Sequence, residues 1–89
     1  MKTPDDVCAA YADKRVELSI RPLDDEMVLV EGDEISLEFL GHLILRQARF
    51  GKDCGFQLTT GTCFFSKESP LGIYIHRTPC LEKEHGKKR

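Results

Sequence analysis

The longest regular pattern in this chain is an apolar stripe that predicts an amphipathic α-helix. Apolar residues recur at intervals of three and four positions, the spacing that places them on one helix face: Ile35, Phe39, Leu40, Leu43, Ile44 and Ala48. Asp33 is placed to cap the start, and the helix should end near Phe50, with Gly51 able to adopt the left-handed conformation that closes a helix. A helix with one apolar face must cover another apolar surface, so the rest of the chain has to supply one.

A second, shorter helix is expected near the start of the sequence. Thr3 can cap free backbone N–H groups, and Pro4 suits the first helical position. Asp5 and Asp6 then place negative charge at the positive end of the helix dipole. Together these residues predict a helix over residues 4–12.

The segment between the two helices has the pattern of a β-hairpin. Apolar and polar residues alternate from Val16 to Ile20, which is the period of a half-buried strand, and this strand should stop near Pro22. Residues 27–30 form a second, fully apolar run. Because residues 23–25 can turn the chain, the second run is expected to pair back on the first.

The remainder of the sequence predicts further strands. Residues 55–59, 62–66 and 72–77 are short segments rich in Phe, Thr, Ile and Tyr, and turn-forming residues separate them. Such a series indicates a three-stranded meander. The predicted fold class is therefore α+β, an antiparallel β-sheet made of the hairpin and the meander, with the long amphipathic helix packed on one face and a short N-terminal helix.

Length and composition set the domain organisation. A chain of 89 residues with 40% hydrophobic content can build one core, so we expect residues 1–81 to form a single domain. Residues 82–89 are polar and charged, which predicts a disordered tail. The sequence has no apolar stretch as long as a signal peptide or a membrane span, and this predicts a cytoplasmic protein. In that compartment all the cysteines should remain free thiols: Cys8, Cys54, Cys63 and Cys80.

Charge is distributed unevenly along the chain. Between Pro22 and Leu45 there are seven acidic residues and no Lys or Arg, and the acids form the candidate partner-binding set: Asp24, Asp25, Glu26, Glu31, Asp33, Glu34 and Glu38. One interpretation is local, since acids suit a turn and a helix start and keep a surface soluble. The functional interpretation is that they steer a basic partner to the hairpin turn and the helix start.

Candidates for chemistry are weaker than the acidic stretch. Cys54, His76 and Cys80 are the residue types that bind zinc or form a nucleophile pair, but no Cys-x-x-Cys motif is present. The glycines are scattered at turns instead of forming a phosphate-binding loop. The negative net charge of the chain disfavours nucleic acid as a partner. The sequence thus predicts no catalytic residue, no bound metal and no cofactor.

Several short segments carry a resemblance to a known family: Val30-Glu31-Gly32-Asp33, Ser36-Leu37-Glu38-Phe39-Leu40, Asp53-Cys54-Gly55-Phe56-Gln57-Leu58, Phe65-Ser66, Leu71-Gly72-Ile73-Tyr74-Ile75-His76-Arg77 and Pro79-Cys80. In these segments the chain resembles small immunity proteins of bacterial polymorphic toxin systems, over roughly Val16 to Cys80. The resemblance implies an α+β protein that binds and silences a toxin domain encoded nearby, and it implies no catalytic residue. The loop at Thr60 and Gly61 is shorter than in that family, so a contact made from this turn does not carry over.

The residues and the resemblance lead to one principal hypothesis and two alternatives. The principal hypothesis is a protein-binding module that occludes the active surface of a cognate toxin protein, a basic nuclease domain being one such partner, without binding nucleic acid or membrane. The first alternative is a small thiol- or zinc-dependent enzyme or sensor that uses Cys54, His76 and Cys80. The second is a homodimer that pairs through an exposed sheet edge or face.

Overall fold

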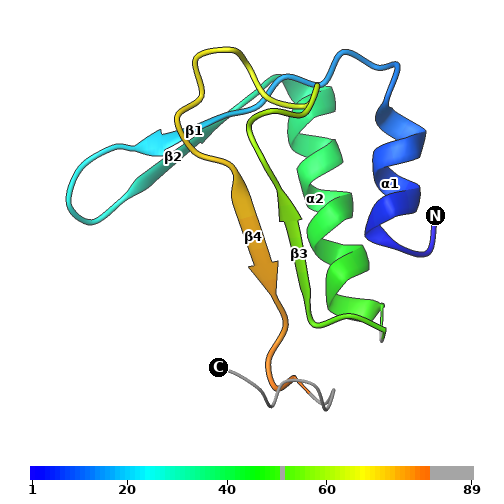
Figure 1. Cartoon of the computed structure of the whole chain (residues 1–89). Helices are drawn as coiled ribbons and strands as arrows, with labels where there is room; N and C mark the ends of the chain where they lie inside the picture. The colour runs from blue at the N-terminus through cyan, green and yellow to red at the C-terminus, as the bar shows by residue number, and fades with distance from the viewer. Residues whose placement is uncertain (51, 81–89) are drawn as a thin grey trace.

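The structure is a computed structural model that describes residues 1–50 and 52–80 of the chain (Figure 1). Its elements follow in the order α1 (Pro4–Tyr11), β1 (Ser19–Pro22), β2 (Val28–Glu31), α2 (Glu34–Arg49), β3 (Gly55–Leu58) and β4 (Ile73–His76). The α+β class predicted from the sequence is confirmed. The predicted left-handed Gly51 and the tail of residues 82–89 lie outside the described residues.

Both helices start where the capping residues predict. At α1, the Thr3 hydroxyl accepts from the Asp6 N–H at 3.0 Å, and the Asp6 carboxylate accepts from the Thr3 N–H at 3.1 Å. At α2, the Asp33 carboxylate accepts from the Ser36 N–H at 3.0 Å. These side chains satisfy N–H groups that have no partner within the helix, so they fix both starting points.

The hairpin forms as predicted, but its first strand begins later than the alternating pattern suggests. β1 and β2 are antiparallel, with Ile20 opposite Val30 and Pro22 opposite Val28. The predicted strand residues before Ser19 do not pair with β2. Leu18 instead forms a parallel bridge with Phe65 and exchanges backbone hydrogen bonds with the segment of residues 64–66. The first strand therefore faces β2 on one side and this segment on the other.

The predicted three-stranded meander is wrong. β3 pairs directly with β4, with Gly55 opposite His76, and residues 62–66 form no strand between them. The two antiparallel pairs make two separate two-stranded sheets instead of one sheet. The adjacent side chains of Phe64 and Phe65 explain the difference, because both are buried and a regular strand would send them to opposite faces.

The core lies where α1, α2, β1 and β3 meet the segment containing Phe64 (Figure 1). Phe39 and Leu43 of α2 are fully buried, and the ring of Phe39 stacks on that of Phe64 with centroids 4.6 Å apart. The predicted stripe is correct in its first half only, since Ile44 and Ala48 are exposed. Gln47 is buried in their place, where its side chain donates to the Asp53 carbonyl at 3.2 Å.

The helices of the described part are too short or too polar to cross a membrane. α2, with 16 residues, is the longer of the two, and it carries Glu34, Glu38, Arg46 and Arg49. This finding concerns residues 1–50 and 52–80 and does not assign a compartment.

Candidate functional site

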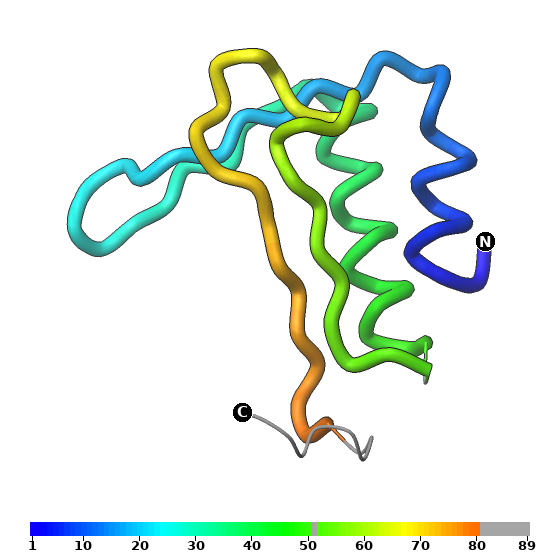
Figure 2. The backbone as a smooth tube through the Cα atoms, in the orientation of Figure 1, coloured from blue at the N-terminus to red at the C-terminus, as the bar shows by residue number. Residues whose placement is uncertain are grey.

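The β1–β2 hairpin extends away from the helices (Figure 2). It carries four of the ten large apolar side chains that are exposed in the described residues. Leu23 is 54% exposed, Met27 53%, Val28 58% and Val30 42%. All of these side chains lie on β2 or at the turn that joins it to β1. An apolar surface that a fold leaves in solvent, with polar residues around it, is typical of a site for another macromolecule.

Three of the predicted partner-binding acids lie at the tip of this hairpin. The Asp24 carboxylate accepts from the Glu26 N–H at 2.8 Å and from the Met27 N–H at 2.9 Å, so it shapes the turn. Asp25 and Glu26 are exposed, and none of the described side-chain hydrogen bonds involves their carboxylates. The tip therefore presents one structural acid and two that are free to meet a partner.

The remaining four acids lie at the base of the hairpin and on the start of α2. Glu31 ends β2, and Glu34 is in the first turn of the helix. Asp33 caps that helix, and the hydrogen bonds from Ser36 hold the pKa of its carboxyl below the usual range. Glu38 lies one turn further along, 3.7 Å from the His42 imidazole.

Glu38 also affects a neighbouring buried residue. Burial raises the pKa of the Tyr11 hydroxyl, and the adjacent carboxylate of Glu38 raises it further. Because Glu38 already faces His42 and Tyr11, it is the least available of the seven acids to a partner.

The structure thus divides the predicted acidic site into two groups, one at each end of β2. Residues 27–33 between them are mostly extended, which separates the groups by about 20 Å. The apolar side chains of the hairpin lie between the two groups. Sequence reasoning missed these side chains, although a signal was present, since a two-stranded hairpin attached only at its base cannot bury both faces of the consecutive apolar residues Met27, Val28, Leu29 and Val30.

The prediction that all four cysteines are free is wrong for two of them. Cys54 and Cys80 form a disulfide with their Cα atoms 5.5 Å apart. The β3–β4 ladder brings them together, because the Arg77 N–H donates to the Cys54 carbonyl at 2.8 Å, one residue beyond the Gly55 and His76 pair. Disulfides persist in oxidising compartments, so the cysteines no longer support the expected cytoplasmic location.

The disulfide also determines whether the candidate residues can bind a metal or act as a nucleophile. Neither Cys54 nor Cys80 has a thiolate while they are bonded to each other. His76 lies on the exposed surface of β4, where its ring is 6.1 Å from that of Tyr74. Across residues 1–50 and 52–80, no group of three or more His, Cys, Asp or Glu side chains is arranged to hold a metal ion.

The other two cysteines are free, as the sequence predicts. Cys8 is half-buried on α1, and Cys63 is exposed in the loop after β3. Burial raises the pKa of the Cys8 thiol, and the nearby charges of Asp5 and of the Cys63 thiolate raise it further. A thiol with a raised pKa is a weak nucleophile at neutral pH, so Cys8 lacks the activation that a catalytic cysteine requires.

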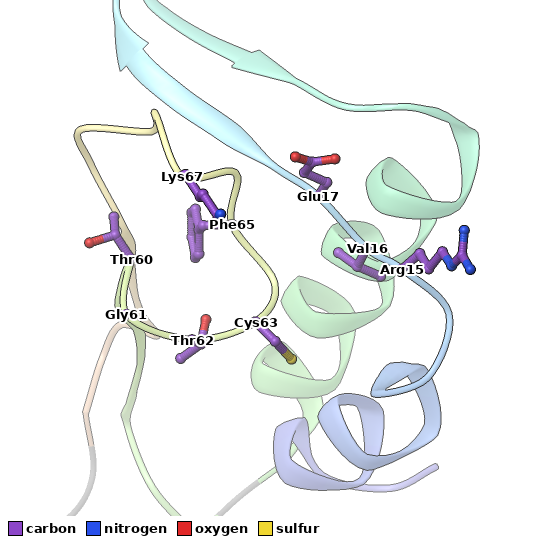
Figure 3. Close-up of a pocket in the computed structure, with 9 residues that line it drawn as sticks. All are labelled: Arg15, Val16, Glu17, Thr60, Gly61, Thr62, Cys63, Phe65 and Lys67. Atoms are coloured by element: carbon purple, nitrogen blue, oxygen red, sulfur yellow. The ribbon is translucent and has the colours of Figure 1, made fainter.

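A cavity of about 560 Å³ lies between residues 15–17 and the loop of residues 60–67 (Figure 3). Glu17 and Lys67 bring opposite charges to it, while the side chain of Arg15 points away from the other lining residues (Figure 3). Arg15 has a φ of 58°, in the left-handed region. The lining combines isolated charges with Thr60, Thr62 and Phe65, and the described contacts of these side chains do not favour one ligand chemistry.

Comparison of the chain with protein-family models, with curated proteins and with solved structures gives no match.

Proposed function

We propose that this chain is a protein-binding module of the immunity type, which binds a bacterial toxin domain through the β1–β2 hairpin and covers its active surface. The observation that carries the proposal is the group of exposed apolar side chains on the hairpin, with acids at both ends of β2. The toxin as the partner comes from the resemblance of residues 16–80 to immunity proteins. It is consistent with a stretch from Pro22 to Leu45 that contains seven acidic residues and no Lys or Arg.

The two kinds of side chain have different roles in this proposal. Asp25 and Glu26 at the tip, with Glu31 and Glu34 at the base, attract a basic surface and orient it. Leu23, Met27 and Val28 then lose their exposure to water in the complex, which slows dissociation. A toxin that acts on an acidic substrate has such a basic surface at its active site, so binding there would block access of the substrate.

The test uses charge reversal at positions that do not support the fold. Asp24 and Asp33 are left unchanged because their carboxylates bond to backbone N–H groups. The double variant Asp25→Lys with Glu26→Lys reverses the tip, and the matched control, Asp13→Lys with Asp53→Lys, makes the same charge change at exposed sites outside the hairpin. The wild-type chain is first used to capture the toxin from a lysate of the bacterium that encodes it, at low and at high salt.

Binding of the purified toxin domain to each variant then decides the question. We expect the tip variant to associate on the order of tenfold more slowly at low salt, with a weaker salt dependence, and the control variant to behave like the wild type. Bacteria that produce the toxin domain should survive when they also produce the wild-type chain. Equal association rates for the two double variants would remove the acidic tip from the proposal, and failure of the wild type to rescue growth would contradict the immunity role.

The disulfide bears on the thiol- or zinc-dependent alternative. An enzyme or sensor based on Cys54 and Cys80 would require the disulfide to be reduced first. Thiol titration and elemental analysis for zinc, before and after reduction, separate this alternative from a binding module, which needs neither a metal nor a reactive thiol.

A further inference from the structure

The outer edge of β2 has backbone groups directed away from its strand partner β1. The Ile20 N–H donates to the Ser69 hydroxyl at 2.8 Å, and the Ile20 carbonyl accepts from the Leu71 N–H at 3.2 Å. Both polar backbone groups of Ile20 therefore face residues 69–71 and not β2. In an antiparallel ladder, a residue whose groups turn away from its partner belongs to a pair without hydrogen bonds, and Val30 is the residue opposite Ile20.

The orientation of Val30 follows from this pairing. Its N–H and C=O face away from β1, and the same holds two residues earlier at Val28, which lies opposite Pro22. Pro22 has no N–H to donate, which agrees with its place in a pair without hydrogen bonds. β1 is the only strand that pairs with β2 within residues 1–50 and 52–80. The outer edge thus offers two donors and two acceptors at the spacing of a β-ladder.

β2 is short and ends in a charged residue, Glu31, but it lacks the other features with which proteins usually protect such an edge. Lys, Pro and β-bulges are the common devices, and the strand Val28–Glu31 contains no Lys, no Pro and no bulge in its register with β1. The side chains of Val28 and Val30 are 58% and 42% exposed, so they do not cover the edge. An unprotected edge of this kind is suited to strand addition, in which main-chain hydrogen bonds hold an extended segment.

We infer that the outer edge of β2 receives an extended, basic segment of the partner as an added strand. This inference rests on the proposed function, because it states how the partner binds to the same hairpin. The acidic residues at both ends of β2 determine which kind of strand can be added at its outer edge. Antiparallel pairing of β2 with a second copy would place the tip acids of each copy beside the helix-start acids of the other, with no Lys or Arg in residues 22–45 to offset them. A strand in which apolar residues alternate with Lys or Arg meets acids at both ends instead.

The test uses a defined peptide and the full chain. The probe is the blocked peptide acetyl-Lys-Val-Lys-Val-Lys-Val-Lys-amide. Two control peptides replace every Lys with Glu, or carry N-methyl groups on alternate residues so that one peptide edge cannot pair. Amide hydrogen exchange followed by NMR gives the readout residue by residue. We expect the Val28 and Val30 amides to exchange about tenfold more slowly in the presence of the Lys peptide, with much less protection from either control.

A variant of the protein gives an independent readout. Val30→Pro removes the N–H that faces outward and leaves the hydrogen bonds between β1 and β2 in place. Proline is tolerated on an edge strand at a residue whose N–H faces away from the partner strand. The control Val30→Thr keeps the N–H and the β-branched shape. We expect the proline variant to lose the peptide-dependent protection of Val28 and the threonine variant to keep it. If circular dichroism shows that Val30→Pro has lost its fold, the N-methylated peptide decides the question alone.

Several results would overturn the inference. They are no protection at millimolar Lys peptide, equal protection by the Glu or N-methylated peptide, or protection of Val28 and Val30 without peptide in a chain that light scattering shows to be a dimer. The last result would identify a second copy as the occupant. Any of these results, together with slower toxin association by the Asp25→Lys and Glu26→Lys variant, would remove strand addition alone and leave the proposed function standing.

Discussion

The hydroxyl of Ser69 accepts a hydrogen bond from the N–H of Ile20 at 2.8 Å, and both residues are buried. The same hydroxyl lies 3.0 Å from the Leu71 carbonyl. The Ser69 hydroxyl and the Leu71 N–H, both from the loop before β4, thus take the place of a neighbouring strand at Ile20 on the inner edge of β1. These contacts close the edge that faces the core, and the free edge of the hairpin is left on the other side, at β2.

Replacement of Ser69 with alanine should be clearly destabilising. The change leaves the Ile20 N–H buried without its acceptor, which costs about 1–3 kcal/mol in the free energy of unfolding. Urea unfolding measures this, with Ser66→Ala as the control, since the Ser66 hydroxyl accepts from the Glu68 N–H at an exposed site. Equal losses in the two variants would contradict the role assigned to Ser69.

The Cys54–Cys80 disulfide should contribute strongly to stability. It closes a loop with a sequence separation of 26, for which the chain-entropy relation gives about 3.5 kcal/mol. The double variant Cys54→Ala with Cys80→Ala should lose stability of this order in denaturant, and Cys63→Ala, at an exposed free thiol, should lose little. An unmodified protein in which mass spectrometry finds four free thiols after purification without reductant would show that the bond does not form.

The two free cysteines should differ in reactivity. Burial, Asp5 and Cys63 raise the pKa of the Cys8 thiol, so at pH 8 Cys8 should react with iodoacetamide more slowly than the exposed Cys63. Removing one of these causes with Asp5→Asn should lower the pKa and speed the reaction of Cys8. Peptide mass spectrometry measures both sites, and Asp13→Asn serves as the control. Faster alkylation of Cys8 than of Cys63 in the wild type would contradict the burial argument.

Stability should depend on the charge of Asp33 at acidic pH. Hydrogen bonds from Ser36 lower the pKa of Asp33 in the folded state, so its contribution is present above the pKa of the unfolded chain and is lost as the pH falls through the folded pKa. The difference in unfolding free energy between the wild type and Asp33→Asn should therefore shrink below about pH 4. Asp25→Asn is the control, because it removes a charge in the hairpin turn, at a residue that caps no helix. A difference that stays constant from pH 7 to pH 2 would exclude this linkage.

An exposed valine of the hairpin should matter for binding and not for folding. Val28→Thr keeps the β-branched shape at a side chain that is 58% exposed, so the free energy of unfolding should change by no more than about 0.5 kcal/mol. Affinity for the proposed toxin partner should fall, because the added hydroxyl has to lose water in the complex. Thr60→Val, the reverse change at an exposed position of the loop after β3, is the control for binding. An unchanged dissociation rate in Val28→Thr would remove this side chain from the interface.

The parts of the fold predicted from the sequence are those determined by neighbouring residues. Thr3 and Asp33 cap the helices that they were expected to cap, and the hairpin turn forms where Asp24 can organise it. The path of residues 62–66 was not predictable in this way. These residues are rich in Phe and Thr, which favour strands. Their position is determined instead by the burial of Phe64 against Phe39, a contact between residues far apart in the sequence.

The candidate site shows the same limit. The acids could be identified from the sequence, but which of them are free could not, because the hydrogen bonds of Asp24 and Asp33 and the contacts of Glu38 depend on local geometry. The disulfide was missed for a different reason. The cysteines were predicted to be free because a reducing, cytoplasmic location was expected, whereas the direct pairing of β3 with β4 brings Cys54 and Cys80 together.

The separation of the two sheets has a consequence for how such a chain can change over generations. Phe39, Leu43 and Phe64 hold the core together, and none of them lies on the hairpin. Substitutions at Met27, Val28 or Val30 would change the proposed binding surface at little cost to folding. A family built on this plan could keep one scaffold and acquire new specificities through a few codons of the hairpin, as antibodies do with their loops.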